Sequence, residues 1–555
     1  MIIHFFQIIS IFLLVSLFIL SCLGYGKFLR NIVFKDHSLL NVGEAGLLGI
    51  FFLIILSYIS SFLFPHNSTH NIVVLILGFF LFFFKKEKIE LKHLKLLLLV
   101  ILISFSFFLI SKNHDDFPYY HLPFALSLSE NKISFGMGLL NYGYRHHSSI
   151  LFLNSLTYLP IIKYFLFNLP NYLILIFVNF LLINNLIENY KKKNIVFLLS
   201  LIFFSVINIK FTRLSEYGTD ISGQIILFVI IINFIDILVN EKRIDKIYYN
   251  LFLLLIVLSF KVYFLIYFIL VLSILYYLKI NPLQKKYFNY KAVTFYLLFL
   301  ALFVAHNFVS TGCVIYPMDV TCVGTKYFWT LDVSEVKRMS LWLESWAKAG
   351  ASPNFRVDNL SEYVKGINWV QGWFNRYFIG KVSDYLLIIF VVNLIVFFSF
   401  NKKVNLEKDF IKIQKILIIT SVIALLIWFF KHPSLRYGGY LPITVLITSL
   451  FLFFYSSIKF KNNNYKITKI FVISVFIIFN LKNIIRLDSE FSRKDQYQFN
   501  NFPYFAVEDK KYKNLKIDNI NYMYTTNGYC WATPTPCSNT PRKARIINNF
   551  IFFER

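Results

Sequence analysis

Long apolar runs separated by short basic segments are the main pattern along this chain. Runs of about 18 or more apolar residues recur throughout, and an α-helix of that length crosses a bilayer. The pattern predicts an all-α polytopic membrane protein with about 14 transmembrane helices, outward-facing loops and a small C-terminal extracytoplasmic segment. The predicted spans are residues 4–24, 45–64, 71–84, 95–111, 166–187, 195–211, 221–239, 248–262, 263–279, 292–309, 384–400, 412–430, 438–457 and 467–483.

The spans and the loops between them divide the chain into segments of different character. They are the N-terminal transmembrane helices 1–111, an outward loop with an acidic motif and a surface helix 112–165, the transmembrane helices 166–309, an outward loop with Trp-rich amphipathic helices 310–383, the C-terminal transmembrane helices 384–483, and an extracytoplasmic C-terminal segment 484–555.

Lys and Arg in the short loops set the expected orientation, because basic loops stay in the cytoplasm. Placing all of these loops there alternates correctly with the spans when 248–279 forms two short helices around Lys261. A single tilted helix would reverse everything after it. Both termini and the long loops then face outward from a bacterial inner membrane. The basic loops are 26–37, 85–95, 188–194, 240–246, 279–291, 401–415 and 459–469.

The composition agrees with a membrane protein. Hydrophobic residues make up 57% of the chain and charged residues 15%, whereas roughly 25% of the residues of a soluble domain are charged. The net charge of +27, from 56 Lys and Arg against 29 Asp and Glu, fits basic cytoplasmic loops beside anionic headgroups. The chain has no basic domain or aromatic RNA-binding motif, so membrane lipids and not nucleic acids are the expected partners.

Four of the five cysteines form two close pairs in segments placed outside, where disulfides persist. Cys313 and Cys322 lie in "TGCVIYPMDVTCVG", and Cys530 and Cys537 lie in "GYCWATPTPCSNTP". Neither pair has the CxxC spacing of a zinc or redox site. The spacing predicts two local disulfides, with free thiols as the alternative.

The stretch "HDDFPYYHLP" places two carboxylates, Asp115 and Asp116, at the mouth of a predicted span. Pro118 suits the first turn of a helix, so one interpretation is that an aspartate caps this helix. A cap needs one carboxylate only, however, and Tyr119 and His121 crowd the same place. An ionised carboxylate beside aromatic rings can accept a hydroxyl proton and bind a sugar, so Asp116, or else Asp115, is the predicted base.

The same loop continues with "GLLNYGYRHHSS", which contains Arg145 and His146. Arg binds phosphate through paired charge-assisted hydrogen bonds, and we list both residues as substrate-binding candidates. The loop is rich in His and has Asp nearby, so a divalent metal is an alternative. No ligand spacing matches a zinc pattern, and no metal site or cofactor is predicted.

Two further span mouths carry charged residues. In "RLSEYGTDISGQ", Glu216 and Asp220 are spaced to share one helix face, either as a second acidic pair in the same cavity as Asp116 or as a solvated turn with a helix cap. In "WFFKHPSLRYGGY", Lys431 and Arg436 either hold a lipid-linked phosphate or snorkel at the interface. Lys261, in an apolar stretch, has the same two interpretations.

Tryptophans repeat at helical spacing in the loop 310–383. Trp342 and Trp346 lie in "LWLESWAKAG", and Trp369 and Trp373 lie in "INWVQGWFNRYF". The spacing favours amphipathic helices on the outer leaflet, with a sugar-stacking platform as the alternative.

The acidic pair in "HDDFPYYHLP" at the start of a long outward loop, followed by "SSILFLNSLTYLPIIKYF" (148–165) as a candidate membrane-surface helix, resembles the GT-C superfamily of membrane glycosyltransferases. The resemblance implies an outward aspartate that acts as base on the acceptor and a polyprenyl-phosphate sugar as donor. Members typically place the acidic motif after the first span with the N-terminus inside, whereas here it follows the fourth predicted span.

The sequence thus predicts a glycosyltransferase that moves a sugar from a lipid-linked donor to a glycan, lipid or protein acceptor of the cell envelope. No Rossmann or P-loop glycine fingerprint is present, as expected for a membrane-borne donor. A polysaccharide polymerase or ligase, which would depend on loop Arg and His, is the nearest alternative. A transporter is the second, although the chain lacks the internal repeats typical of that class.

Overall fold

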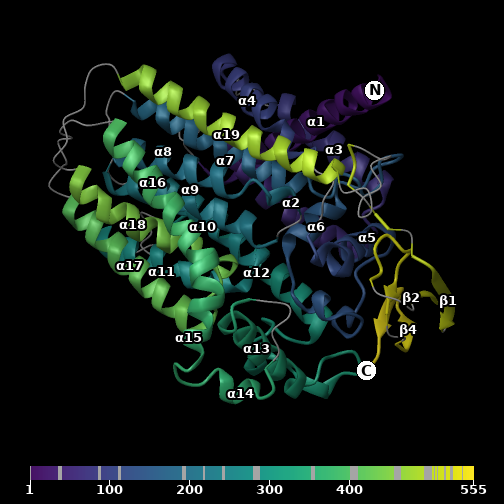
Figure 1. Cartoon of the computed structure of the whole chain (residues 1–555). Coiled ribbons are helices and arrows are strands. Elements are labelled where there is room, and N and C mark those ends of the chain that lie inside the picture. The colour runs from purple at the N-terminus through teal and green to yellow at the C-terminus, as the bar shows by residue number, and fades with distance from the viewer. Residues whose placement is uncertain are drawn as a thin grey trace.

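The computed structural model is a bundle of helices with a small group of strands at its C-terminal end (Figure 1). The structure describes residues 2–34, 41–84, 89–109, 114–190, 195–216, 219–239, 244–278, 288–351, 357–399, 410–455, 464–492, 503–505, 507–508, 510–517, 520–525, 529–539 and 542–555. Part of each predicted cytoplasmic loop lies outside these residues.

Helices form the body of the molecule, and a helix suits long apolar runs because it satisfies every backbone hydrogen bond within one segment. The longer helices are α1 (Ile2–Val33), α2 (Val42–Leu63), α3 (Ser68–Phe84), α4 (Leu91–Ser104), α7 (Leu169–Asn189), α8 (Ile195–Lys210), α9 (Ile221–Val239), α10 (Ile244–Phe260), α11 (Phe268–Leu278), α12 (Tyr290–Thr311), α16 (Ser383–Ser399), α17 (Phe410–Lys431), α18 (Tyr440–Tyr455) and α19 (Asn464–Ser492). Between them lie α5 (Leu122–Glu130), α6 (Ser149–Ser155), α13 (Val333–Lys348), α14 (Leu360–Tyr363) and α15 (Trp369–Trp373).

Eight helices in the described part of the chain are long and apolar enough to cross a membrane, which is consistent with a membrane protein. The expected count of about 14 spans is not confirmed, because several of the predicted spans coincide with shorter apolar helices. The long helices are His4–Val33, Val42–Leu63, Leu169–Asn189, Ile221–Leu238, Tyr290–Thr311, Trp369–Ser399, Ile411–Lys431 and Lys466–Ser492, and the shorter ones are Ser68–Phe84, Ile195–Lys210, Val262–Tyr277 and Tyr440–Leu452.

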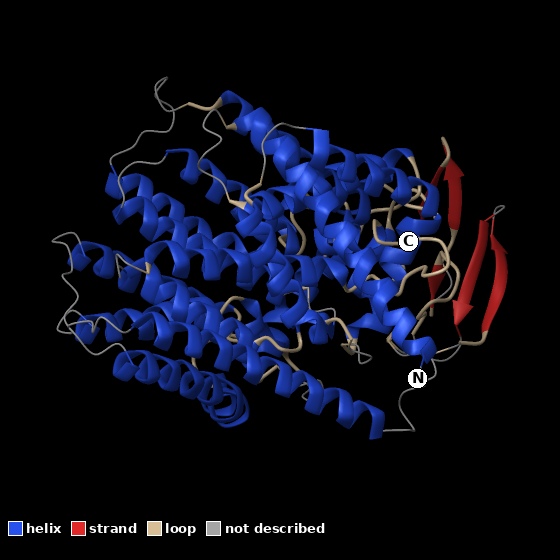
Figure 2. Cartoon of the chain, turned by 90° about the horizontal axis from the view of Figure 1, so that it is seen from above, coloured by secondary structure: helices blue, strands red, loops and turns tan. Residues whose placement is uncertain are grey.

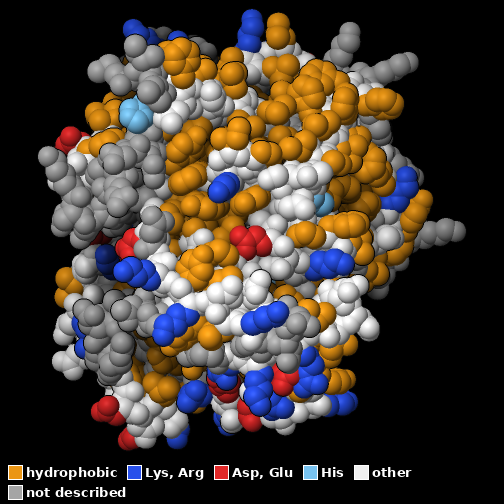
Figure 3. Space-filling model, turned by 90° about the vertical axis from the view of Figure 1, so that its right-hand side faces the viewer, with side chains coloured by type: hydrophobic (Ala, Val, Ile, Leu, Met, Phe, Trp, Pro, Cys, Tyr) orange, Lys and Arg blue, Asp and Glu red, His pale blue; other side chains and the backbone are white. Residues whose placement is uncertain are grey.

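Burial separates central helices from peripheral ones. In α9 the side chains of Ile230 and Ile235 are completely buried, whereas in α19 Ile485 is 66% exposed. A helix that is apolar all round packs against protein at the centre of the bundle or exposes apolar side chains at its edge, where lipid can cover them. On the face drawn in Figure 3, hydrophobic side chains gather in the upper part and charged side chains are frequent lower down.

Helical structure is interrupted at Lys261. This residue lies between α10 and the 3₁₀-helix η7 (Val262–Tyr267), which leads into α11. Lys261 has an extended backbone, with φ −155° and ψ 130°. The two short helices expected around Lys261 are therefore present.

The segments that join helix ends gather at one end of the bundle, which we call the loop end. It consists of residues 105–109, 114–168, 312–351, 357–382 and 432–439. Backbone hydrogen bonds tie these segments to the helices, because Ile133 N–H donates to Ser61 C=O (2.9 Å) at the end of α2 and Gly136 N–H donates to Val309 C=O (2.9 Å) in α12. The strands lie beside this end, all on one side of the helices (Figure 2).

The C-terminal segment contains strands that the all-α prediction lacks, so the chain is mostly but not entirely helical. The antiparallel strands β1 (Tyr512–Ile517) and β2 (Ile520–Thr525) and the short β3 (Cys537–Ser538) form one sheet, and β4 (Ala544–Ile547) pairs with β5 (Phe550–Phe553) in a hairpin. Asn548 and Asn549 join the hairpin with positive φ angles of 50° and 64°, the conformation that a two-residue turn of matching twist requires. Both predicted disulfides, Cys313–Cys322 and Cys530–Cys537, are present.

The two candidate surface helices differ from their predictions. Instead of a membrane-surface helix over 148–165, the chain forms the seven-residue α6, whose side chains are buried, followed by turns. Trp369 and Trp373 are also buried, and both rings pack against Phe429 of α17. The apolar faces that the spacing assigned to the bilayer surface pack against neighbouring helices instead. Trp342, at 43% exposure, remains on the surface.

Candidate active site

The two aspartates of the acidic motif face different environments. Asp115 is exposed, whereas the side chain of Asp116 is one-third exposed at the start of a π-helical turn, η3 (Phe117–His121). The Asp116 side chain makes no capping hydrogen bond to this turn, so the helix-cap interpretation fails for Asp116. Its N–H instead donates to His114 Nδ1 (3.1 Å), which lies 3.5 Å from the carboxylate oxygen Oδ2.

Asp220 is the centre of a buried ionic cluster at the loop end. It precedes α9, is 7% exposed, and lies between two cations from other segments. Its Oδ1 is 3.4 Å from Lys261 Nζ and its Oδ2 is 3.2 Å from Arg436 Nε. Burial opposes ionisation, but Lys261 and Arg436 outweigh it and hold the pKa of Asp220 below its usual value. Asp220 is thus a carboxylate with two cationic partners.

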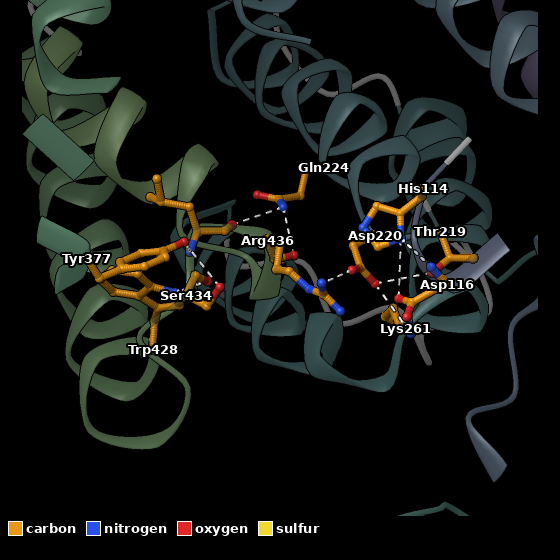
Figure 4. A network of polar contacts seen from close by, with 11 residues as sticks. His114, Asp116, Thr219, Asp220, Gln224, Lys261, Tyr377, Trp428, Ser434 and Arg436 are labelled. Carbon is orange, nitrogen blue, oxygen red and sulfur yellow. Dashed lines mark hydrogen bonds and ion pairs between the residues drawn. The ribbon is translucent and has the colours of Figure 1, made fainter. Parts of the chain in front are cut away.

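The segment that carries Arg436 is fixed by side chains from several helices. One helical turn after Asp220, Gln224 Nε2 donates to the carbonyls of Leu435 (3.1 Å) and Arg436 (3.0 Å). Trp428 Nε1 donates to Ser434 C=O (2.8 Å), and Leu435 N–H donates to the Tyr377 hydroxyl (2.8 Å). Figure 4 shows these contacts on one side of Arg436 and the Asp220 cluster on the other. Gln224 of α9 therefore positions the backbone around Arg436, and Asp220, just before α9, positions its side chain.

A glycine gives this segment its turn. Gly438 follows Arg436 and Tyr437 with φ 101°, in the left-handed region that favours glycine. Its carbonyl accepts a hydrogen bond from the Tyr267 hydroxyl of η7. A Cβ atom at this position would lie 3.4 Å from the Tyr267 ring. The hydrogen bond between Tyr267 and Gly438 thus connects the Arg436 segment to η7, which follows Lys261.

Asp116 lies within electrostatic range of the same cluster. Burial lowers the pKa of Arg436, but Tyr437 and the Asp220 and Asp116 carboxylates raise it, and the net direction is upward. His114 also interacts electrostatically with Asp220. Four segments therefore converge here: the acidic motif, the start of α9, the residue that follows α10 and the turn between α17 and α18. Figure 4 shows this for Asp116, Asp220 and Lys261.

Two histidines border this cluster in neutral form. Burial, with Lys261 and Arg145, lowers the pKa of His146 to about 3. Burial, with His114 and Lys261, lowers the pKa of His121 well below its usual value. Neither ring adds positive charge at neutral pH, so Lys261 and Arg436 carry the fixed charge. Within the described residues no group of three His, Cys, Asp or Glu is arranged to hold a metal ion.

Arg145 is held by protein groups and does not bond Asp220. It is 3% exposed, its Nε donates to Gly138 C=O (2.7 Å), and its Nη2 donates to Glu335 Oε1 (2.8 Å). Its guanidinium also lies over the Tyr142 ring at 4.4 Å. These contacts connect the 112–165 loop to α13, and phosphate binding by Arg145 stays a prediction.

The remaining candidates divide between the site and its surroundings. Lys431 is 66% exposed, and its Nζ lies 3.9 Å from Glu344 Oε2, away from Asp220. Glu216 lies in a short 3₁₀ turn, and its side chain is outside the described residues. Tyr119 is partly buried near Asp116, and burial raises its pKa to about 12. Of the predicted set, Asp116, Asp220, Arg436, His121 and His146 come together.

Two further residues border the site, and the sequence leaves two interpretations open for each. Lys261, assigned either to a lipid-linked phosphate or to snorkelling, pairs with Asp220. Trp346, assigned either to a surface helix or to a sugar-stacking platform, has the Arg436 guanidinium over its ring at 5.1 Å. Trp346 and Trp342 stack with ring centroids 6.4 Å apart, so the tryptophan pair of α13 borders the ionic cluster.

Residues 8–442 match the model of a family described as Domain of unknown function (DUF8201). The match covers most of the chain, and the chain therefore belongs to this family. The matched range includes all the residues of the ionic cluster and ends before the C-terminal strands. Comparison with curated proteins and with solved structures returned no match.

Proposed function

We propose that this member of the DUF8201 family is a membrane glycosyltransferase of GT-C type. It transfers a sugar from a polyprenyl-phosphate donor to a glycan, lipid or protein acceptor at the outer face of the bacterial inner membrane. The observation that carries the proposal is the Asp220 cluster with its cations Lys261 and Arg436, drawn with the Asp116 carboxylate beside it in Figure 4 and close enough for Asp116 to act on Arg436 electrostatically. A base and a cationic phosphate site side by side are what glycosyl transfer from a phosphate requires.

Arg436 and Lys261 bind the donor phosphate in this proposal. Asp220 pairs with both cations and holds their side chains next to each other, and one carboxylate between two cations leaves a net positive charge for the phosphate. The Arg436 side chain is 32% exposed, so part of it can be reached from outside the cluster, although its Nε is buried. Arginine suits this role because its planar guanidinium pairs with phosphate oxygens.

Asp116 accepts the proton of the acceptor hydroxyl. The hydroxyl oxygen forms a bond to the anomeric carbon of the sugar, while the bond between that carbon and the phosphate oxygen breaks. The electron pair leaves with the phosphate, whose growing charge Arg436 and Lys261 stabilise. A sugar joined to the acceptor and a free polyprenyl phosphate are the products.

The contacts of Arg145 favour this reaction over that of a polymerase or ligase dependent on loop arginine. Its guanidinium bonds Gly138 and Glu335 in place of a substrate phosphate. The charged cluster lies at the loop end of the bundle. This position favours a reaction near the membrane surface over transport, because transporters bind their substrates near the membrane midplane.

Reconstitution of the full chain in proteoliposomes tests the proposal. The protein is incubated with radiolabelled polyprenyl-phosphate hexoses and pentoses in the presence of mixed soluble oligosaccharide acceptors, with nucleotide sugars as the control donors. The proposal predicts release of polyprenyl phosphate and labelled oligosaccharide from a lipid-linked donor only. Transfer from nucleotide sugars, or no release from any lipid-linked donor, would overturn it.

A further inference from the structure

The C-terminal segment beyond the family match packs directly on the acidic motif. Trp531 N–H donates to Pro118 C=O (3.2 Å), two residues after Asp116. Thr535 donates from its N–H and its hydroxyl to Glu130 Oε2 (2.7 and 2.6 Å) at the end of α5. The Cys530–Cys537 disulfide closes the loop that makes these contacts. The segment thus forms part of the wall around the proposed base.

This segment brings a tyrosine ring to the motif. The Tyr529 ring is 5.4 Å from that of Tyr119, and Tyr529 is 47% exposed. The Tyr119 hydroxyl lies against the backbone of Tyr142, which is itself 48% exposed. We call Tyr119, Tyr142 and Tyr529 the tyrosine rim. It combines residues of the 112–165 loop with one residue from the C-terminal segment.

The chemistry of the rim matches a neutral polyhydroxylated ligand. Tyrosine offers an apolar ring face to sugar C–H groups and a hydroxyl to sugar oxygens. The Arg145 guanidinium, which lies over the Tyr142 ring at 4.4 Å, is paired with Glu335 (2.8 Å), and this pairing reduces the positive charge that it offers to an anion.

We infer that the tyrosine rim binds a carbohydrate acceptor and presents its hydroxyl to Asp116. The inference rests on the proposed function and adds the acceptor class and the contribution of the C-terminal segment to it. Acceptor selection then depends on Tyr529, a residue outside the matched family range of 8–442.

Binding to an array of bacterial oligosaccharides tests the inference without requiring transfer. The purified full chain in detergent is compared with Tyr529→Ala, Tyr529→Phe and Tyr512→Ala. Tyr512, on β1, is a matched control because it is 46% exposed and lies in the same C-terminal segment. We expect Tyr529→Ala to weaken binding about tenfold, Tyr529→Phe to retain most of it, and Tyr512→Ala to bind like the wild type.

Asp116→Asn separates this inference from the proposed function. We expect this variant to bind the same oligosaccharides as the wild type while losing transfer. Transfer retained by Asp116→Asn contradicts the proposed base and leaves the rim to be judged by the binding data. Wild-type binding by a folded Tyr529→Ala protein, confirmed by an unchanged melting temperature, overturns the inference. No binding of any oligosaccharide by the wild type also overturns it.

Discussion

Arg436 Nε lies 3.2 Å from Asp220 Oδ2, although one residue follows α17 and the other precedes α9. The same carboxylate meets Lys261 Nζ at 3.4 Å through its other oxygen. Three segments far apart in the sequence therefore share one buried charge network. Its integrity determines whether two cations stay next to Asp116.

Replacing Asp220 by Asn should destabilise the protein, because two cations would remain with no carboxylate between them. Breaking a buried ion pair costs roughly 3–5 kcal/mol, and Lys261→Met added to Asp220→Asn should recover part of that loss. Thermal unfolding in detergent measures the change. Lys431→Met is the control, since Lys431 is 66% exposed and should change stability by no more than about 0.5 kcal/mol. Equal melting temperatures for wild type and Asp220→Asn would refute the network.

Arg145 and Glu335 should show coupled effects on stability. Glu335→Gln removes the negative charge that compensates the buried Arg145 guanidinium. The losses of unfolding free energy in Glu335→Gln and Arg145→Ala should therefore not add up to the loss in the double variant. A coupling energy of roughly 0.5–3 kcal/mol is expected for contacting residues. A double-mutant cycle by thermal unfolding provides it. If instead Glu335→Gln is neutral and Arg145→Ala abolishes transfer in a stable protein, Arg145 acts on substrate.

Stability should fall as the pH drops below about 6.5, in part because of His146. Burial lowers the pKa of this imidazole to about 3 in the folded protein, whereas the unfolded chain takes up the proton near its usual value. The contribution of the neutral ring is thus complete above the unfolded pKa and is lost progressively as the pH falls towards the folded pKa. His146→Gln should reduce the slope of the free energy of unfolding against pH by roughly 1 kcal/mol per pH unit. Melting temperatures measured from pH 7.5 to 5 compare the two slopes, and identical slopes would exclude the effect.

Features that depend on local pattern could be predicted from the sequence. Apolar runs located the helices, and the lone charge at Lys261 located the break between α10 and α11. Close cysteine spacing located both disulfides. Each of these features depends on neighbours within a few residues or on the period of one helix.

Features that depend on tertiary pairing could not be predicted in the same way. Arg145 has the chemistry of a phosphate ligand, and only the fold brings Glu335 of α13 to its guanidinium. Asp220 resembled a cap or one member of an acidic pair, and its cationic partners come from distant segments. The β4–β5 hairpin did carry a signal, because the Asn548–Asn549 pair between apolar residues is typical of a two-residue turn.

The most direct test of the proposed function compares Asp115→Asn with Asp116→Asn in the proteoliposome transfer assay. The two residues are adjacent and undergo the same chemical change, but only Asp116 lies beside the Arg436 cluster, while Asp115 is exposed. General-base catalysis contributes about 10²–10⁴-fold, so Asp116→Asn should lower the transfer rate by at least about 100-fold, with Asp115→Asn close to wild type. A wild-type rate for a folded Asp116→Asn protein would contradict the account.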